Sequence, residues 1–247
     1  NGPRGLIMEV VIVLILLIFL LFGIGYGFRK NIYKEVDRLE AWKIDIMNQS
    51  ITDELSKVKE LIMSGETEEL FERWRKDWDD IVTSRLPNVE ELLFEAEEYA
   101  EKYRFKKSKE VLLHIESVLK EIEEQIAGIV QHINDLVATE SSNKTEGEAV
   151  KQQLKELKKT LLSHRHTFGT AYERLEKELY EMLHTMEKFD EEMNSGNYVT
   201  AKEILDEQKQ KLEALQLKVE EIPKLLTECQ MIVPNEISEL KEGYKKL

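Results

Sequence analysis

Nineteen uncharged residues form a long apolar run near the start of the chain, from Val10 to Phe28. A helix of this length extends about 28 Å at 1.5 Å per residue, which matches a bilayer core of about 30 Å. Such a helix satisfies its own backbone hydrogen bonds inside lipid. A cleaved signal peptide would need a basic start and a small-x-small cleavage site, whereas Glu9 precedes the run and no A-x-A follows it. The pattern therefore predicts a transmembrane anchor at 10–28.

Basic residues distinguish the two sides of this anchor. Arg4 is the single basic residue before it. Three cations follow it closely: Arg29, Lys30 and Lys34. The positive-inside rule then predicts a short outer N-terminus at 1–9 and a cytoplasmic C-terminal part. The three cations are expected to contact anionic lipid headgroups, with about 1 kcal/mol from each near the surface. The residues before Met8, a candidate initiator, are left out of the fold prediction.

Beyond the anchor, apolar residues recur every three or four positions, which is the period of an amphipathic helix. The pattern runs through 29–62, breaks at Ser64-Gly65 and resumes at Thr67. Pro87 is expected to end this second helix, because a proline ring disfavours the helical conformation of the residue before it. A short helix is then expected from Asn88, a good N-cap residue, to Tyr103.

The most regular stretch lies between residues 108 and 136, where apolar positions alternate by four and three without a slip. This is a heptad seam, which predicts left-handed packing of one helix on another. The seam consists of Ser108, Leu112, Ile115, Leu119, Ile122, Ile126, Ile129, Ile133 and Leu136.

A polar segment with a glycine, TESSNKTEGE at 139–148, follows the seam. It is expected to form a loop at which the chain turns back antiparallel. The return helix, from Glu148 to Asn194, would extend about 70 Å. Ser195-Gly196-Asn197 is expected to end it, and a third seam follows from 198 to 222.

The third seam repeats the first at a shift of 93 residues. Phe105 then falls on Tyr198, and the block Lys109–Leu112 falls on Lys202–Leu205. This period suits spectrin-like three-helix bundles joined by continuous helices, although two heptad stretches also align by chance when slid far enough. The predicted fold is all-α: a transmembrane helix, then a rod of long antiparallel helices in bundle segments 29–138 and 149–247. The helical pattern still runs at the last residue, so the second segment is expected to be truncated.

Composition narrows the function classes. Lys, Glu and Leu are abundant, 34% of the residues are charged, only four are prolines, and the formal net charge is -14. Such a mixture is typical of long helices and coiled coils. Nucleic acid is not expected as a partner, because duplex binding needs a basic face. The single cysteine, Cys229, excludes an internal disulfide and agrees with a reducing cytoplasm.

No pattern of residues predicts catalysis or a cofactor. Glu181 and His184 have the spacing used by di-iron bundles, but such sites need two of these motifs and two further glutamates. His164 falls on a seam, where a core histidine is expected, and His166 faces another side of the helix. The pair Trp74 and Trp78, one turn apart, is expected to anchor a core rather than to bind a ligand. We therefore predict no enzyme activity, no cofactor and no metal site.

Several blocks resemble the EzrA family of septation-ring regulators from low-GC Gram-positive bacteria. The first combines the end of the anchor with a characteristic order of aromatic and charged residues, FRKNIYKEVDRLEAWKIDIMNQSI. Together the matching blocks cover nearly all of the chain from residue 8, and they lie at 28–51, 69–82, 100–112, 196–205 and 222–226.

The resemblance implies a single-pass membrane protein, enriched at the division septum, whose cytoplasmic rod binds the tubulin-like division protein FtsZ. It implies that the protein restrains assembly of the FtsZ ring and links the ring to other divisome and cell-wall synthesis proteins. Members of the family extend well beyond residue 247, so no FtsZ-contacting residue is assigned here.

Two other interpretations stay open. The chain could be a membrane-tethered coiled-coil scaffold or signalling protein with a different partner, although its outer segment is too short to sense with. An anchored metalloenzyme would instead have to contain bound iron or manganese. A homodimer is also compatible with the sequence, since long heptad seams can close within one chain or between two.

Overall fold

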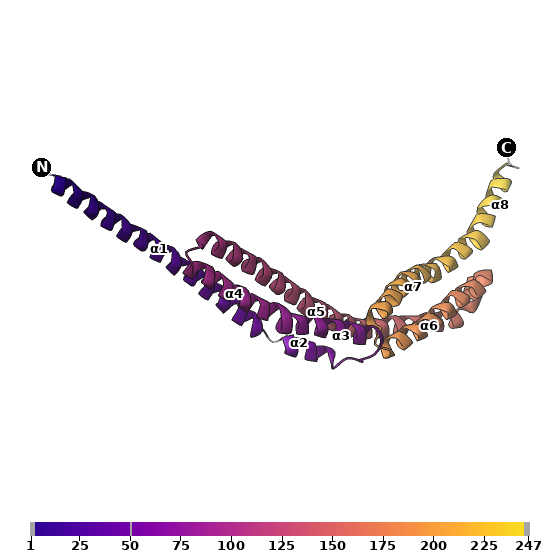
Figure 1. Cartoon of the computed structure of the whole chain (residues 1–247). Coiled ribbons are helices and arrows are strands. Elements are labelled where there is room, and N and C mark those ends of the chain that lie inside the picture. Colours follow the sequence, from indigo (N-terminus) through magenta and orange to yellow (C-terminus); the bar gives the residue numbers. More distant parts are fainter. Residues whose placement is uncertain (1–2, 50, 245–247) are drawn as a thin grey trace. The chain divides into compact units, whose positions relative to one another are not determined.

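The computed structural model describes residues 3–49 and 51–244, with side chains from residue 7 onward (Figure 1). Every regular element within these residues is helical, so the all-α prediction is confirmed for them. The α-helices are α1 (Pro3–Met47), α2 (Ile51–Val58), α3 (Gly65–Asp80), α4 (Leu86–Glu101), α5 (Phe105–Ser163), α6 (Tyr172–Asn194), α7 (Tyr198–Thr227) and α8 (Val233–Tyr244). Short π segments lie at Ile81–Arg85 and Glu228–Ile232, and a 3-10 segment lies at Arg165–Ala171.

The chain forms two compact units. The first combines residues 1–55 with 72–132, and the second combines 56–71 with 133–247. Helix α5 therefore contributes its first half to one unit and its second half to the other. This division assigns 56–71 to the second unit, whereas the sequence pattern grouped that segment with the first.

The first unit is a bundle of α1, α4 and the first half of α5, which lie side by side in Figure 1. Ion pairs fix their directions. Lys43 of α1 pairs with Glu90 of α4 at 3.5 Å, and Arg38 pairs with Glu116 of α5 at 3.3 Å. The Phe28 and Phe105 rings also stack on each other. Helices α1 and α5 are therefore parallel, because the later residue of α1, Arg38, meets the later residue of α5, Glu116. Helix α4 runs antiparallel to both.

The predicted heptad seam is the apolar face of α5, and its positions from Ser108 to Ile129 lie in this bundle. All nine of its positions from Ser108 to Leu136 are buried, so this prediction is confirmed. Ser108 is the polar member, and its hydroxyl donates a 2.7 Å hydrogen bond to the carbonyl of Ala96 on α4. A buried hydroxyl without such a partner would lower stability, so this contact allows a serine in the core. The buried positions continue beyond Leu136, and we call the whole stripe from Ser108 to Leu161 the α5 seam.

Pro87 does not end a helix, which corrects the sequence-based expectation. Helices α3 and α4 are joined by the π segment Ile81–Arg85, and Asn88 lies inside α4 rather than at its start. The N–H of Leu86 donates to the carbonyl of Ile81, five residues back. This wider turn changes the hydrogen-bond register just before the proline, so the missing N–H and the ring of Pro87 are accommodated without a loop.

The second unit is also a three-helix bundle, made of the second half of α5 with α6 and α7. Lys151 of α5 pairs with Asp190 of α6 at 2.6 Å, and Lys218 of α7 pairs with Glu178 of α6 at 2.7 Å. Helix α6 is therefore antiparallel to its neighbours. Helices α5 and α7 are parallel, since the contacts Glu146–Lys209 and Gln153–Gln216 share the same offset of 63 residues.

The loop expected at 139–148 is wrong, because α5 continues through this segment to Ser163. Two residues that suggested a turn are used for packing instead. Asn143 is 1% exposed and its amide donates to the Tyr198 carbonyl at 2.8 Å. At Gly147, a Cβ atom would lie 2.6 Å from Cε1 of Phe189, so only glycine allows this ring to approach the helix. The chain turns back at 164–171, where Gly169 has a φ of 53°, and the expected return helix is thus split.

The repeat at 93 residues extends to the backbone of two turns. Tyr103, between α4 and α5, has a φ of 57°, and Gly196, between α6 and α7, has a φ of 73°. Four hydrogen bonds around Tyr103 recur at the same shift around Gly196, including Arg104 N–H to Tyr99 O and Asn197 N–H to Glu192 O. The break predicted at 195–197 is confirmed.

Residues 62–67 cover the α6–α7 turn. The Thr67 hydroxyl donates to the Gly196 carbonyl at 2.7 Å, and the Ser64 hydroxyl donates to the Ser195 carbonyl at 2.8 Å. The Glu66 N–H donates to the Asn197 side chain at 2.9 Å. These bonds satisfy backbone groups that a helix terminus otherwise leaves without partners.

We expect Gly196→Ala to destabilise the protein by roughly 2 kcal/mol, a fall in Tm of about 4–8 °C. The substitution forces a left-handed conformation on alanine, and its Cβ would lie 2.5 Å from the Ser64 carbonyl oxygen. The matched control is Gly128→Ala inside α5, where a Cβ would meet nothing within 4 Å. This control should stabilise the helix by about 0.5–1 kcal/mol, and thermal unfolding followed by circular dichroism measures both.

Leu119→Asp should destabilise the first unit by roughly 3 kcal/mol or more, because Leu119 is fully buried on the α5 seam and a carboxylate there has no partner. Its neighbour Lys120 is exposed, so Lys120→Asp should change the unfolding free energy by only about 0.5 kcal/mol. Equal urea midpoints for the two variants would contradict the assignment of the seam.

Candidate membrane-proximal site

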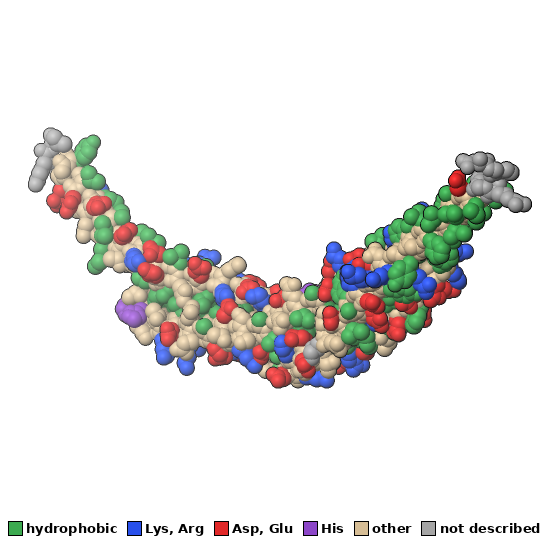
Figure 2. Space-filling view, turned by 90° about the vertical axis from the view of Figure 1, so that its left-hand side faces the viewer, with side chains coloured by type: hydrophobic (Ala, Val, Ile, Leu, Met, Phe, Trp, Pro, Cys, Tyr) green, Lys and Arg blue, Asp and Glu red, His purple; other side chains and the backbone are tan. Residues whose placement is uncertain are grey.

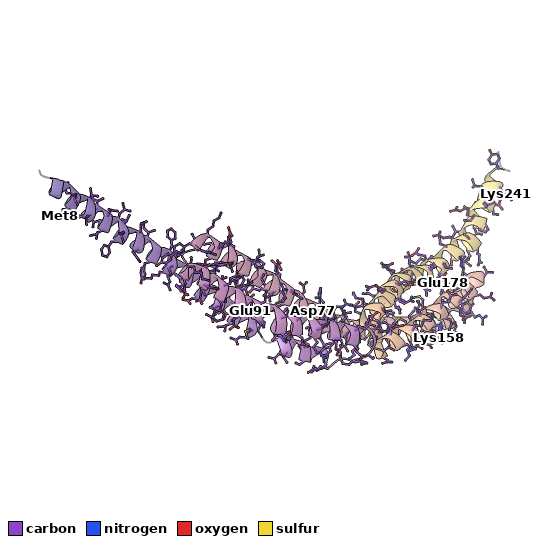
Figure 3. The ribbon with its side chains drawn as sticks, in the orientation of Figure 1. Met8, Asp77, Glu91, Lys158, Glu178 and Lys241 are labelled. Carbon is purple, nitrogen blue, oxygen red and sulfur yellow. The ribbon has the colours of Figure 1, made fainter. Side chains whose placement is uncertain are left out.

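The first part of α1 presents its hydrophobic side chains without protein cover. Leu16, Phe19 and Phe22 are 62%, 71% and 66% exposed, and an 18-residue window of the helix has a mean hydropathy of 3.2. Met8 is labelled on this part of α1 in Figure 3, where no other helix lies against it. By length and composition this helix can cross a membrane, which is consistent with the predicted anchor.

The three cations predicted to contact headgroups do not form one cluster. Lys30 and Lys34 are exposed and lie one turn apart on the same face of α1. Arg29 is directed toward protein instead: it donates to the Tyr33 hydroxyl at 3.3 Å and pairs with Glu101 at 3.7 Å. These contacts, with the Tyr33 hydrogen bond as the largest cause, raise the pKa of Arg29 above its ordinary value. Arg29 is thus a charged link between α1 and the end of α4.

Aromatic rings gather beside this link, at the α4–α5 turn. The Phe28 ring stacks on Phe105 with 5.6 Å between centroids, and Tyr103 meets Phe105 edge-on at 5.9 Å. Tyr103 also covers Gly25, where a Cβ would lie 3.2 Å from Cε1 of the tyrosine ring. The sequence pattern did not indicate Tyr103 or Phe105 for this site, because they lie more than 70 residues from the predicted anchor. The available signal was the position of Phe105 at the start of a helix, which Tyr198 matches at a shift of 93 residues.

Carboxylates lie close together one turn further into the first unit. Burial and the nearby charges of Glu40, Glu101 and Asp37 raise the pKa of Glu97 above its ordinary value, with burial as the largest cause. Elsewhere, acidic and basic side chains are interspersed over the face shown in Figure 2.

The residues considered for chemistry lie apart from one another. His184 contacts Glu187, with 3.1 Å from Nδ1 to Oε2, rather than Glu181, whose spacing to it had been noted in the sequence. His164 is exposed at the end of α5, so its expected place in the core is wrong: the helix ends there instead of continuing along the seam. Cys229 is exposed. Among the described residues, no group of three or more His, Cys, Asp or Glu side chains is arranged to hold a metal ion.

The two tryptophans differ in burial. Trp74 is 5% exposed and belongs to the core, as expected, whereas Trp78 is only partly buried.

A family model described as "Septation ring formation regulator, EzrA" matches residues 10–247. This chain belongs to the EzrA family. The resemblance found in the sequence blocks is therefore confirmed.

Among curated relatives, the septation ring formation regulators EzrA of Bacillus licheniformis and Bacillus subtilis are 51% and 48% identical to this chain over 240 residues. Each alignment covers 97% of this chain and 43% of the relative, so the chain spans less than half the length of these proteins. A solved structure of the cytoplasmic domain of bacterial cell division protein EzrA matches with a TM-score of 0.59 and 46% identity. It covers 87% of this chain and 38% of that one.

Glu97→Gln should stabilise the protein at neutral pH by about 0.5 kcal/mol, since it removes a carboxylate that like charges and burial disfavour. Because the folded pKa is raised, the carboxylate costs stability only above its unfolded pKa of about 4.3. The stabilisation by Glu97→Gln should therefore grow as the pH rises above about 4.3 and disappear below that pH.

Chemical unfolding at several pH values between acid and neutral measures this difference. Glu91→Gln is the matched control, because Glu91 is exposed on the same helix (Figure 3). An advantage of Glu97→Gln that persists unchanged at acid pH would contradict the electrostatic explanation.

Proposed function

We propose that this chain is the membrane-anchored N-terminal part of a bacterial cell-division regulator. It binds FtsZ at the cytoplasmic face of the membrane and restrains assembly of the FtsZ ring, acting as a scaffold without catalysis. The observation that carries this proposal is the match of residues 10–247 to the septation ring regulator family, together with the exposed apolar surface of α1.

The proposed topology follows from the flanks of the anchor. The short N-terminus lies outside, residues 10–28 cross the membrane, and the helical part lies in the cytoplasm at the division septum. Lys30 and Lys34 contact headgroups directly, since both are exposed just after the span. Arg29 contributes less to this contact, because its guanidinium also pairs with Glu101.

The anchor gives the physical basis of regulation. A binding surface confined to a thin layer beside the membrane meets its partner at a raised effective concentration. The bundles supply the spacing. Both units are attached to the uninterrupted helix α5, whose 59 residues extend about 88 Å. In each unit the first and third helices are parallel and the middle one antiparallel, which supports the spectrin-like arrangement.

The alternative is a membrane-tethered scaffold or signalling protein with a partner other than FtsZ, including a second copy of the chain. The discriminating test reconstitutes the full chain in lipid vesicles and adds FtsZ with GTP. We expect FtsZ to sediment with the vesicles and its assembly, followed by light scattering, to be suppressed.

Leu119→Asp is the matched loss-of-structure variant in this test, and Lys120→Asp is its folded control. FtsZ that assembles normally and stays in the supernatant with the wild-type chain would refute binding through this part of the protein.

Cys229 tests the topology, because it is the single cysteine and it is exposed. In intact cells a membrane-impermeant maleimide should leave Cys229 unlabelled, and labelling should appear after permeabilisation. In a variant that combines Gly2→Cys with Cys229→Ser, the new cysteine should be labelled in intact cells, before permeabilisation. Labelling of Cys229 in intact cells would place the helical part on the wrong side of the membrane for this function.

A further inference from the structure

We propose that the α4–α5 turn, residues 102–109, is a second lipid-contacting element that binds anionic headgroups beside the anchor. The proposal rests on the proposed insertion of residues 10–28, and it adds to the flanking cations of α1 a surface from a distant part of the chain.

The composition of the turn contrasts with that of the whole protein. Five of the eight residues in KYRFKKSK are cations and none is acidic, in a chain with a formal net charge of -14. All five are exposed: Lys102, Arg104, Lys106, Lys107 and Lys109. Clusters of basic residues immediately cytoplasmic of a transmembrane helix are attracted to anionic lipid.

The structure places this turn beside the end of the predicted span. Tyr103 packs over Gly25, which is buried although the positions on either side of it in α1 are exposed. Gly25 lies three residues before the end of the predicted span, about 4.5 Å along the helix. Tyr103 is itself 58% exposed, with its ring beside the anchor, and tyrosine is enriched at the membrane–water interface.

Most of the positive charge in the turn is available to lipid. Arg104 and Lys106 form no salt bridge within the part of the chain that the structure describes, and Lys109 lies over the Phe28 ring, 5.4 Å from its centroid. Two of the nearby carboxylates are already engaged, since Glu98 pairs with Lys102 and Glu101 pairs with Arg29.

The repeat-related turn provides an internal comparison. The segment 195–202 has the same backbone hydrogen bonds as 102–109, but it contains a single cation, Lys202. Residues 62–67 cover that turn with hydrogen bonds from protein. The backbone hydrogen bonds of the turn therefore form without the cations or a tyrosine at this position, which agrees with a binding role for them beside the proposed anchor.

Lipid fits this surface better than an acidic protein segment does. The exposed tyrosine touches the hydrophobic span itself, so a partner must meet an apolar edge and a cluster of cations together. An anionic bilayer offers acyl chains and phosphates at that same boundary.

The test uses the full chain with Cys229→Ser and a single new cysteine, Lys106→Cys, carrying an environment-sensitive fluorophore. The protein is inserted into vesicles of phosphatidylcholine alone or mixed with phosphatidylglycerol, each with a spin-labelled lipid as quencher. We expect strong quenching that depends on phosphatidylglycerol. A label at Lys120, about 21 Å further along α5, should show none.

Charge reversal identifies the contact. Arg104→Glu with Lys107→Glu should lower the phosphatidylglycerol-dependent binding of the labelled turn by roughly tenfold or more, because two cations near the surface are lost. The matched control is Lys155→Glu with Lys159→Glu, two exposed cations on the second half of α5, which should leave the quenching unchanged. Circular dichroism verifies that each variant is folded.

Extraction of the vesicles with alkaline carbonate separates the two proposals. A chain that stays inserted but shows no quenching at residue 106, or equal quenching without phosphatidylglycerol, refutes the lipid-contacting turn and leaves the anchor in place. A chain that is extracted refutes the anchor and the turn together. A label that is shielded only after FtsZ is added would show that the turn is a protein-binding surface and would overturn the lipid proposal.

Discussion

Burial of one continuous stripe on α5 is the constraint on which the rest of the structure depends. The α5 seam runs from Ser108 to Leu161 in steps of three and four residues, apart from one step of seven between Leu136 and Asn143. Gly128 and Gly147 are the glycines of this stretch, and it contains no proline. A helix of 59 residues cannot bury such a stripe against a single short partner. The neighbours must therefore change along its length: α1 and α4 cover the first half, and α6 and α7 cover the second.

Local patterns predicted the parts of the fold that local forces determine. The α5 seam, the break at 195–197 and the start of a helix at Tyr198 could be identified from periodicity and turn residues, since these signals lie within one or two turns of the element they define. The segment 139–148 could not be, because its glycine is explained by the Phe189 ring and its asparagine by the Tyr198 carbonyl, both distant in sequence.

The same distinction applies to the candidate site. Lys30 and Lys34 could be proposed as headgroup contacts from the sequence because they closely follow the predicted anchor. Tyr103 and Phe105 required the structure, since only the parallel packing of α1 and α5 brings them to Gly25 and Phe28. Pro87 is a similar case, because helix propensity alone predicts a break there. In the folded chain the π segment before Pro87 keeps the backbone helical.

Helix α1 extends without interruption from Pro3 to Met47, so the proposed anchor and the first helix of the bundle belong to one continuous helix. Tyr103 covers Gly25 on this helix, so a side chain of the first unit also packs against the proposed anchor. A transmembrane helix tilts when the bilayer becomes thinner than its hydrophobic length. With residues 10–28 inserted as proposed, such a tilt would be passed directly to the first unit, because the same helix forms part of its core.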